Sequence, residues 1–280
     1  MCFTKSGILI DSGIIGLSFK IVNNLCENRD MEKRETSWGS VSKWYGGIVG
    51  EKGHFFHQTL VIPGALRLLD IKNGDRILDV ACGQGVLARR LPGEVSYTGV
   101  DMARGLIDEA KRMDKNKKHK YIVADVTKSI PAEEKYNKAA ILLALQNIKE
   151  PDKTIKLVSE KLDKSGKMLI VLNHPCFRIP RQSSWENDPK NKLQYRRINR
   201  YMSPLEIPIN MHPGDRNSPV TWSFHLPIEE YSKMLFDNGF LIEKIEEWTS
   251  DKESVGKMAK SENRARDEFP MFMAILAIKK

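Results

Sequence analysis

The segment Ile77-Leu-Asp-Val-Ala-Cys-Gly-Gln-Gly-Val-Leu-Ala-Arg89 contains residues whose types and spacing suit ligand binding. Gly83 and Gly85 remove side chains where the backbone has to turn sharply and approach a ligand closely. The helix expected after this turn directs its first N–H groups toward the same ligand. Asp79 lies four residues before Gly83, where its carboxylate can organise the turn and meet a cationic group. The segment therefore predicts a site for a charged ligand at the end of a strand.

A dinucleotide site is the rival interpretation, because Gly83-x-Gly85-x-x-Ala88 also matches the pattern G-x-G-x-x-A. A carboxylate directly upstream of the glycines would repel two nearby phosphates. Asp79 therefore favours a ligand that carries an ammonium and a sulfonium over one that carries a pyrophosphate.

Two more acidic residues end the next two predicted strands. Asp101 lies sixteen residues after Gly85, where a carboxylate can accept both hydroxyls of a ribose. Asp125 follows the third strand, where it can accept from the amino group of an adenine. A strand-end acid can also simply cap the following turn or helix, and this alternative stays open for each one.

With these acids in place, the segment from Gly74 to Leu172 resembles the class I S-adenosylmethionine-dependent methyltransferases. It is similar in particular to the small-molecule enzymes of ubiquinone and menaquinone biosynthesis. The resemblance implies S-adenosyl-L-methionine as cofactor, and it implies contacts with it from Asp79, Ala81, Gly83, Gly85, Asp101, Met102, Asp125, Val126 and Ala144. The stretch 143–148 resembles the segment that passes beneath the sulfonium, where the family often carries a histidine in place of Gln146 or Asn147.

The elements around these residues alternate between strands and helices, which predicts an α/β fold with a doubly wound, mostly parallel sheet. Strands are predicted at residues 76–81, 96–100, 121–124, 138–145, 167–172, 240–247 and 271–278. Helices are predicted at residues 54–69, with a kink or break at Pro63, and at 86–91, 103–113, 151–162 and 228–238. The resemblance implies that the last two strands form an antiparallel pair, which makes this a seven-stranded, Rossmann-like methyltransferase fold.

The regular alternation stops for about 50 residues after the fifth strand, which in a domain of this size indicates a functional insertion. We expect residues 174–225 to form a lid on the substrate side of a methyltransferase domain that spans residues 31–280. Residues 1–30 are expected to be a disordered tail or an upstream extension of the reading frame, with translation starting at Met31.

The first residues of the insertion supply candidates for catalysis. His174 comes directly after the fifth strand and has an ordinary pKa near neutrality, so it is the candidate general base. An equally good interpretation is that it fixes the turn at Pro175 through hydrogen bonds.

Substrate contacts are expected from the residues that follow. Arg178 and Arg181 can clamp a carboxylate or phosphate through paired hydrogen bonds, or can serve surface solubility. Trp185, together with Tyr201 and Trp222, can build an aromatic wall for a planar acceptor, or can form the small core of the insertion itself.

The composition constrains partners and setting. Lys and Arg total 45 against 36 Asp and Glu, a formal net charge of +9, which favours an anionic partner or a basic solvated surface. Four widely spaced cysteines and no C-x-x-C pair indicate a reducing, cytoplasmic setting with neither zinc nor disulfides. No apolar run is long enough for a membrane span, and no motif predicts a metal site.

These observations predict an enzyme that transfers a methyl group from S-adenosyl-L-methionine to a small aromatic or anionic metabolite. An RNA methyltransferase that uses the basic insertion is the first alternative, and a non-catalytic S-adenosylmethionine-binding module is the second. The acceptor atom and the oligomeric state are not predicted.

Overall fold

The computed structural model describes residues 54–132, 134–211 and 218–280, so the predictions for residues 1–30 and for a start at Met31 lie outside the described residues. A seven-stranded sheet has the order β10-β11-β5-β4-β1-β2-β3. Its strands are β1 (Arg76–Val80), β2 (Ser96–Asp101), β3 (Lys120–Val123), β4 (Tyr136–Leu142), β5 (Leu162–Asn173), β10 (Phe240–Trp248) and β11 (Phe272–Lys279). Strands β1 to β5 are parallel, and β11 runs antiparallel between β5 and β10. The predicted fold class is confirmed.

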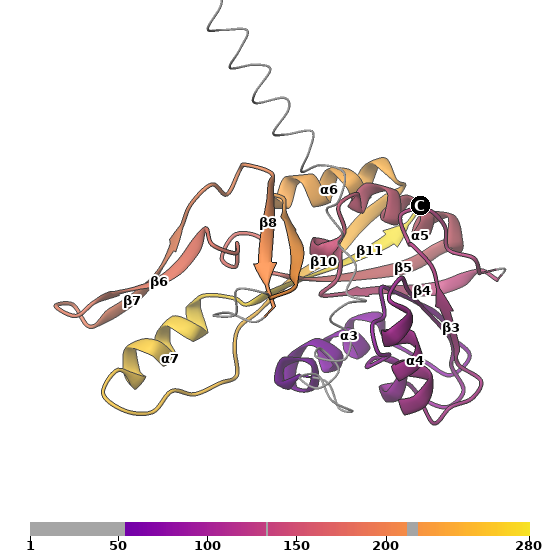
Figure 1. Cartoon of the computed structure of the whole chain (residues 1–280), viewed down its shortest axis with the longest axis horizontal. Helices are drawn as coiled ribbons and strands as arrows, with labels where there is room; N and C mark the ends of the chain where they lie inside the picture. Colours follow the sequence, from indigo (N-terminus) through magenta and orange to yellow (C-terminus); the bar gives the residue numbers. More distant parts are fainter. Residues whose placement is uncertain (1–53, 133, 212–217) are drawn as a thin grey trace, which may run out of the picture. The chain divides into compact units, whose positions relative to one another are not determined.

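Helices cover both faces of this sheet, as the near-continuous apolar strands require. Residues 168–172 of β5 are completely buried, so both of its faces need a covering layer. The apolar sides of α5 (Pro151–Lys161) and α6 (Ile228–Asp237) pack on one face, and α3 (Ile62–Leu69) packs on the other. Figure 1 shows α5 and α6 on one side of the sheet, with α3 and α4 (Arg104–Met113) on the opposite side.

The helix predicted over residues 54–69 is continuous from residue 55 and widens into a π-helical segment directly before Pro63. A π-helical turn, η3 (His57–Val61), precedes α3, and Pro63 occupies the first turn of α3. A proline lacks the N–H that would continue the hydrogen-bond ladder, so it is tolerated only at such a start. The wider π turn places Val61 in the core.

One prediction of local structure was wrong, and one helix was not predicted. The helix expected over residues 86–91 is a turn followed by one short 3-10 turn, η4 (Ala88–Arg90), because Leu91 is extended in front of Pro92. The charged segment 250–268 contains a helix, α7 (Ala259–Glu268), that its sequence did not indicate. Ser261 and Ala265 are its only buried residues, so it has almost no apolar stripe to recognise.

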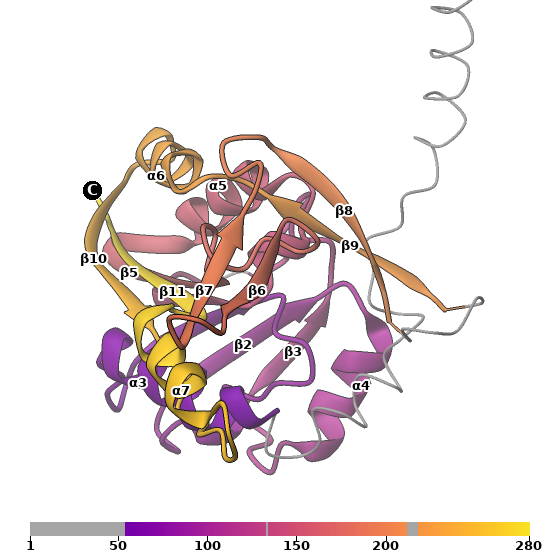
Figure 2. The same cartoon turned by 90° about the vertical axis from the view of Figure 1, so that its left-hand side faces the viewer.

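The insertion after β5 consists of two β-hairpins. One pairs β6 (Ser183–Asp188) with β7 (Leu193–Ile198), and the other pairs β8 (Leu205–Asn210) with β9 (Val220–His225). Strand β7 packs against α7 (Figure 2). Strand β9 packs against the 3-10 turn η5 (Leu145–Asn147), which follows β4. Among the helices of the described residues, none is long and apolar enough to cross a membrane.

Candidate active site

A small cleft of about 60 Å³ opens at the carboxyl end of β1. The loop after β1 forms one wall, and the turn before α3 forms the other. The lining residues are His57, Ile62, Asp79, Ala81, Cys82, Gly83, Gln84, Val86, Leu87 and Leu142. The cleft therefore lies where the glycine segment predicted a ligand, and the N-terminal helical segment closes it.

The two glycines of the loop have different structural reasons. Gly83 has a φ of +54°, and a Cβ atom there would meet no atom within 4 Å, because the position faces the open cleft. Gly85 has a φ of +72°, but a Cβ atom there would lie 2.7 Å from the Tyr121 Oη. Ala81 also has a positive φ, +55°, which costs a residue with a Cβ about 1 kcal/mol. Gly83 thus leaves room for a ligand, whereas Gly85 leaves room for a side chain of the protein.

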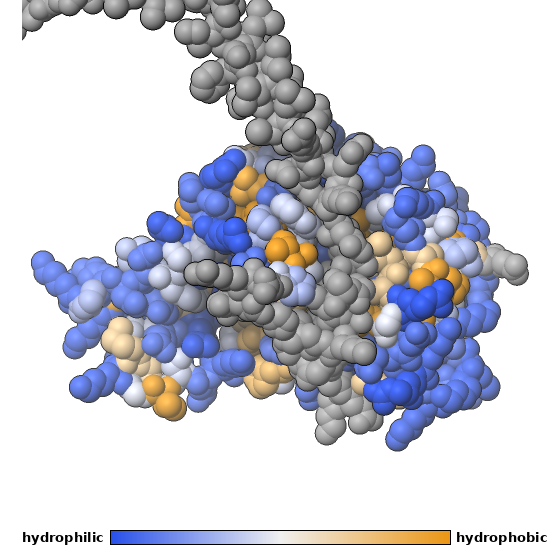
Figure 3. Space-filling model, viewed as in Figure 1, coloured by the Kyte–Doolittle hydropathy of each residue, from blue (hydrophilic) through white to orange (hydrophobic). Residues whose placement is uncertain are grey.

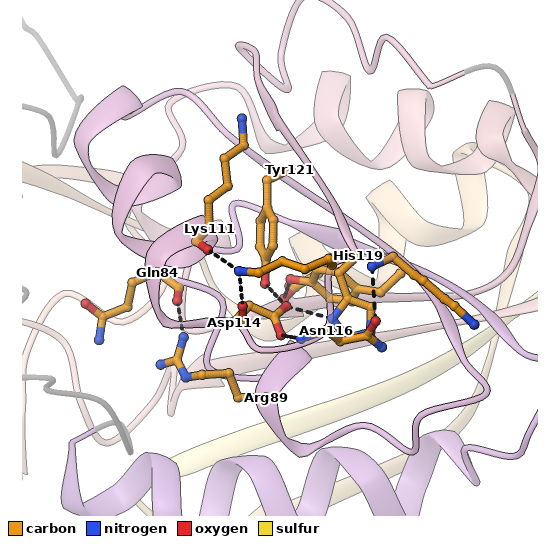
Figure 4. A network of polar contacts seen from close by, with 11 residues as sticks. Gln84, Arg89, Lys111, Asp114, Asn116, His119 and Tyr121 are labelled. Carbon is orange, nitrogen blue, oxygen red and sulfur yellow. Dashed lines mark hydrogen bonds and ion pairs between the residues drawn. The ribbon is translucent and has the colours of Figure 1, made fainter.

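A buried polar network supports the loop from below (Figure 4). Tyr121, the neighbour of Gly85, donates a hydrogen bond of 2.6 Å to the Asp114 carboxylate, and His119 contacts the same oxygen at 2.7 Å. Arg89 donates to the Gln84 backbone oxygen within the loop. The position of Tyr121, and through it the space beside Gly85, is therefore fixed by buried hydrogen bonds.

Asp79 lies at the base of the cleft and is 3% exposed. Burial raises the pKa of this carboxyl to about 7, the Tyr97 hydroxyl opposes the rise by donating a hydrogen bond of 2.7 Å, and the Asp101 charge adds to it. Within the described part of the chain, no cation is among the groups that shift this pKa. A ligand ammonium in the cleft would supply the missing positive charge, so this position fits the amino-acid end of S-adenosylmethionine.

Asp101 ties the glycine loop to the turn after β2. Its two carboxylate oxygens accept hydrogen bonds from the N–H of Gly83, at 2.9 Å, and of Ala103, at 2.8 Å. Burial raises the pKa of Asp101, and these two hydrogen bonds oppose the rise. Each oxygen keeps a further lone pair, so the carboxylate can still accept from ribose hydroxyls. Met102, the next residue, is 44% exposed and offers an apolar surface beside it.

Asp125 has the geometry of the capping alternative. It accepts hydrogen bonds from the Thr127 N–H at 3.0 Å and hydroxyl at 2.7 Å, and it lies 3.0 Å from the Lys128 ammonium. Burial raises its pKa, but these partners outweigh burial and the pKa is lowered overall. Val126 is buried in the main core, so its side chain contributes to packing.

The segment after β4 contains a buried polar atom that is available to hydrogen-bond a ligand. Leu143 has a φ of +53°, and the half-buried Ala144 leads into η5. The Gln146 side-chain oxygen is buried without a hydrogen-bond partner among the described residues.

His57 lies at the wall of the cleft, and its Nδ1 is likewise buried without a hydrogen-bond partner among the described residues. Burial, and after it the charge of His54, lowers the pKa of His57 to about 4. Sequence reasoning did not assign His57, because only the π turn brings it to the cleft.

His174 is held by hydrogen bonds on both ring nitrogens. Its Nε2 lies 2.6 Å from a Glu247 carboxylate oxygen, and its Nδ1 accepts from the backbone N–H of Cys176, at 3.2 Å, and of Phe177, at 3.3 Å. Burial lowers the pKa of His174, the hydrogen bond to Glu247 opposes this, and the charge of Arg178 lowers it further. The ring is 1% exposed, and it organises the turn at the start of the insertion.

The structure brings together Arg178 and Trp185 but places Arg181 at the surface. The Arg178 Cζ lies 5.7 Å from the centre of the Trp185 ring, and the Arg196 Cζ lies 5.0 Å from it. Arg181 is exposed, with a φ of +58°. Tyr201 supports the insertion itself, since its hydroxyl accepts from the Ile228 N–H at 3.1 Å. Among the described residues, no group of three or more His, Cys, Asp or Glu is placed to hold a metal ion.

The strand order, with an antiparallel strand between β5 and β10, is that of the class I S-adenosylmethionine-dependent methyltransferase fold, and the acid-and-glycine cleft lies at the end of β1. Residues 71–203 match the family model described as a methyltransferase domain. Two structures of a glycopeptide N-methyltransferase, which are 14% and 13% identical to the chain with TM-scores of 0.52 and 0.53, hold S-adenosyl-L-methionine and sinefungin.

Individual proteins show the same likeness. A demethylmenaquinone methyltransferase of Staphylococcus saprophyticus is 25% identical over 191 residues, which are 66% of this chain and 78% of that protein. A structure described as an S-adenosylmethionine-dependent methyltransferase of Listeria monocytogenes is 24% identical, with a TM-score of 0.58, over 78% of this chain and 99% of that one. One from Mesorhizobium loti is 21% identical, with a TM-score of 0.61, over 79% of this chain and 99% of that one.

Proposed function

We propose that this methyltransferase acts on a small aromatic or anionic metabolite held between the cofactor cleft and the insertion, residues 174–225. The observation that carries the proposal is the position of Arg178 against Trp185 directly after β5. In a parallel sheet, ligands bind beyond the carboxyl ends of the strands, which is where both the cleft and this pair arise. An aromatic ring beside a guanidinium suits a planar acceptor with a negative group.

The cofactor roles that we assign follow from the cleft. Bound S-adenosylmethionine supplies an electrophilic methyl group. Asp79 would hold its ammonium, and Asp101 its ribose hydroxyls. Gly83 and Ala81 leave the backbone open beside it, and His57 closes the other wall. The remaining contacts that we propose come from Gly85, Met102, Asp125, Val126 and Ala144.

Methyl transfer is an in-line displacement, so the chain chiefly has to align the acceptor and exclude water. A general base is needed only for an acceptor that keeps its proton near neutral pH. His174 stays the candidate for that role, but to act it has to exchange one of its hydrogen bonds, to Glu247 or to the Phe177 turn, for the acceptor. We therefore assign it a positioning role first.

An RNA substrate is the second candidate, because the insertion presents several exposed basic residues. Arg181, Lys190, Lys192, Arg197 and Arg200 are exposed, and the β6–β7 hairpin is mostly hydrophilic in Figure 3. RNA binding through such residues weakens steeply with salt, whereas binding of a half-buried metabolite does not. The two candidates therefore differ in a measurable property.

The test is a two-stage experiment on the full chain. Calorimetry with S-adenosylhomocysteine first establishes cofactor binding in the wild type and its loss in Asp79→Asn. Radiolabelled S-adenosylmethionine is then incubated with cell extract separated into small molecules and RNA, at low and high salt. Label in the small-molecule fraction at both salt concentrations supports the proposal. Label in RNA alone would refute it, and binding without any transfer would leave a non-catalytic binding module.

A further inference from the structure

Two arginines, Arg178 and Arg196, lie over the Trp185 ring, and the charge of a third, Arg266, acts on Arg178. Arg178 belongs to the turn after β5, Arg196 to β7 and Arg266 to α7. We infer that Arg178, Arg196 and Arg266 form a binding site for one oxyanion, a carboxylate or phosphate group of the substrate. This inference rests on the proposed function and specifies its substrate class.

The protein fixes two of the guanidiniums with neutral groups. Arg196 donates to the Phe177 carbonyl oxygen at 2.8 Å and to the Ser183 hydroxyl at 2.9 Å. Arg266 donates to the Ser254 hydroxyl at 2.9 Å. Neutral acceptors orient these cations without cancelling their charge, so the positive field of the cluster remains available to a ligand.

Arg178 carries the clearest sign of an absent partner. Its Nε atom is buried and has no hydrogen-bond partner among the described residues. Burial, and after it the charges of Arg196 and Arg266, lower the pKa of Arg178 to about 10. Within the described part of the chain, no carboxylate lies within 4.0 Å of any of these three arginines in an ion pair. Half-buried like charges are unfavourable without a counter-ion, so an anionic ligand would stabilise the arrangement.

Aromatic rings surround the cluster and define the rest of the ligand. Trp185 meets Phe269 edge to face with ring centres 5.5 Å apart, and Phe269 meets Phe177 in the same way at 5.5 Å. A guanidinium fork matches the two oxygens of a carboxylate or phosphate, and the indole offers a face to a planar group. The site therefore suits a small molecule that joins an oxyanion to an aromatic or other planar body.

The position of Arg178 connects this site with methyl transfer. It lies five residues after Asn173, the last residue of β5, and hence follows the sheet edge at which the cofactor cleft opens. An acceptor anchored there by its oxyanion would extend toward that edge. The arginines act on substrate binding and take no part in bond formation.

The experiment is calorimetric titration of the full chain, saturated with S-adenosylhomocysteine, with phenyl phosphate, benzoate and the neutral analogue benzamide. We expect the two anions to bind the wild type at least tenfold more tightly than benzamide. Arg178→Gln and Arg266→Gln should each weaken the anions tenfold or more. The matched control is Arg197→Gln, which removes the exposed arginine next to Arg196 in β7. It should change the affinity for the anions less than twofold.

Equal anion affinity in wild type, Arg178→Gln and Arg266→Gln would overturn the inference, as would an equal loss in Arg197→Gln. Should Arg178→Gln fail to fold, Arg266→Gln decides the question, because among the described residues the Arg266 side chain hydrogen-bonds a serine hydroxyl and nothing else. A 12-nucleotide RNA that displaces phenyl phosphate, and loses affinity in both variants, would overturn the small-molecule assignment. Titration with S-adenosylhomocysteine tests the proposed function separately, and its failure would refute that function. The anion titrations are then repeated on the chain without S-adenosylhomocysteine, where the same comparison of variants tests the arginine site.

Discussion

The Tyr97 hydroxyl donates a hydrogen bond of 2.7 Å to the Asp79 carboxylate, and both groups are buried at the base of the cofactor cleft. This bond is the main interaction that opposes the rise of the Asp79 pKa. It therefore controls whether the carboxylate is charged when the cofactor arrives.

Tyr97→Phe should raise the Asp79 pKa further above 7, because the carboxylate loses its hydrogen-bond donor. Binding of S-adenosylhomocysteine should then weaken about tenfold near pH 7 and recover as the pH rises, an effect worth about 1.4 kcal/mol. Calorimetry between pH 6 and 9 measures the shift. Tyr121→Phe is the control, since its hydroxyl bonds Asp114 instead, and an equal shift there would contradict the assignment.

Asp79→Asn should stabilise the protein without ligand at neutral pH while it abolishes cofactor binding. The folded-state pKa is about 7 and the unfolded one is near 4, so ionisation of Asp79 costs stability progressively between pH 4 and 7. Below pH 4 the carboxyl is protonated in both states and the cost disappears. Thermal unfolding should show that the stability of the variant relative to the wild type increases as the pH rises from 4 to 7, by a few kcal/mol at most. A stability difference that does not change with pH would argue against a raised pKa of Asp79.

Gly83→Ala and Gly85→Ala should have opposite effects on binding and folding. Both need a positive φ, which costs about 1 kcal/mol. Gly85→Ala adds a clash with Tyr121 and should lower the free energy of unfolding by about 1 to 3 kcal/mol more. Gly83→Ala meets no protein atom, but its methyl group enters the cleft and should reduce cofactor affinity.

Denaturant unfolding and calorimetry on both glycine variants test this difference. Tyr121→Phe combined with Gly85→Ala should restore part of the lost stability, because the hydroxyl nearest the new methyl group is gone. No recovery would mean that the contact with the Tyr121 hydroxyl does not account for the loss.

His174→Asn should destabilise the fold by about 1 to 3 kcal/mol, because the Glu247 bond and the acceptor for the Phe177 turn are lost together. Affinity for S-adenosylhomocysteine should be unchanged. Once a substrate is in hand, the pH profile of kcat distinguishes the roles. If the pH profile of kcat loses one of its sloping limbs in the variant while KM is unchanged, His174 is a general base.

The sequence alone determined the parts of this protein that depend on local pattern. The buried strand before Gly83, the acids Asp79 and Asp101, and the alternation of strands and helices required a parallel sheet with a ligand at one edge. Apolar periodicity, and turns that require the backbone conformations of glycine, depend on only a few neighbouring residues. They can therefore be recognised in the sequence alone. Pro63 was also visible in the sequence, and in the structure a π-helical segment directly precedes it.

The tertiary structure decided everything that depends on contacts between distant residues. Gly85 is required by Tyr121, and His57 reaches the cleft through a π turn. The charges of Arg196 and Arg266 act on Arg178 although separate elements carry the three residues. Helix α7 lacks an apolar stripe and is placed by its packing against β7, which no local pattern encodes. Asp79 depends on both sequence and tertiary structure. Its spacing from the glycines was visible in the sequence, but its pKa rises to about 7 because the folded chain buries it.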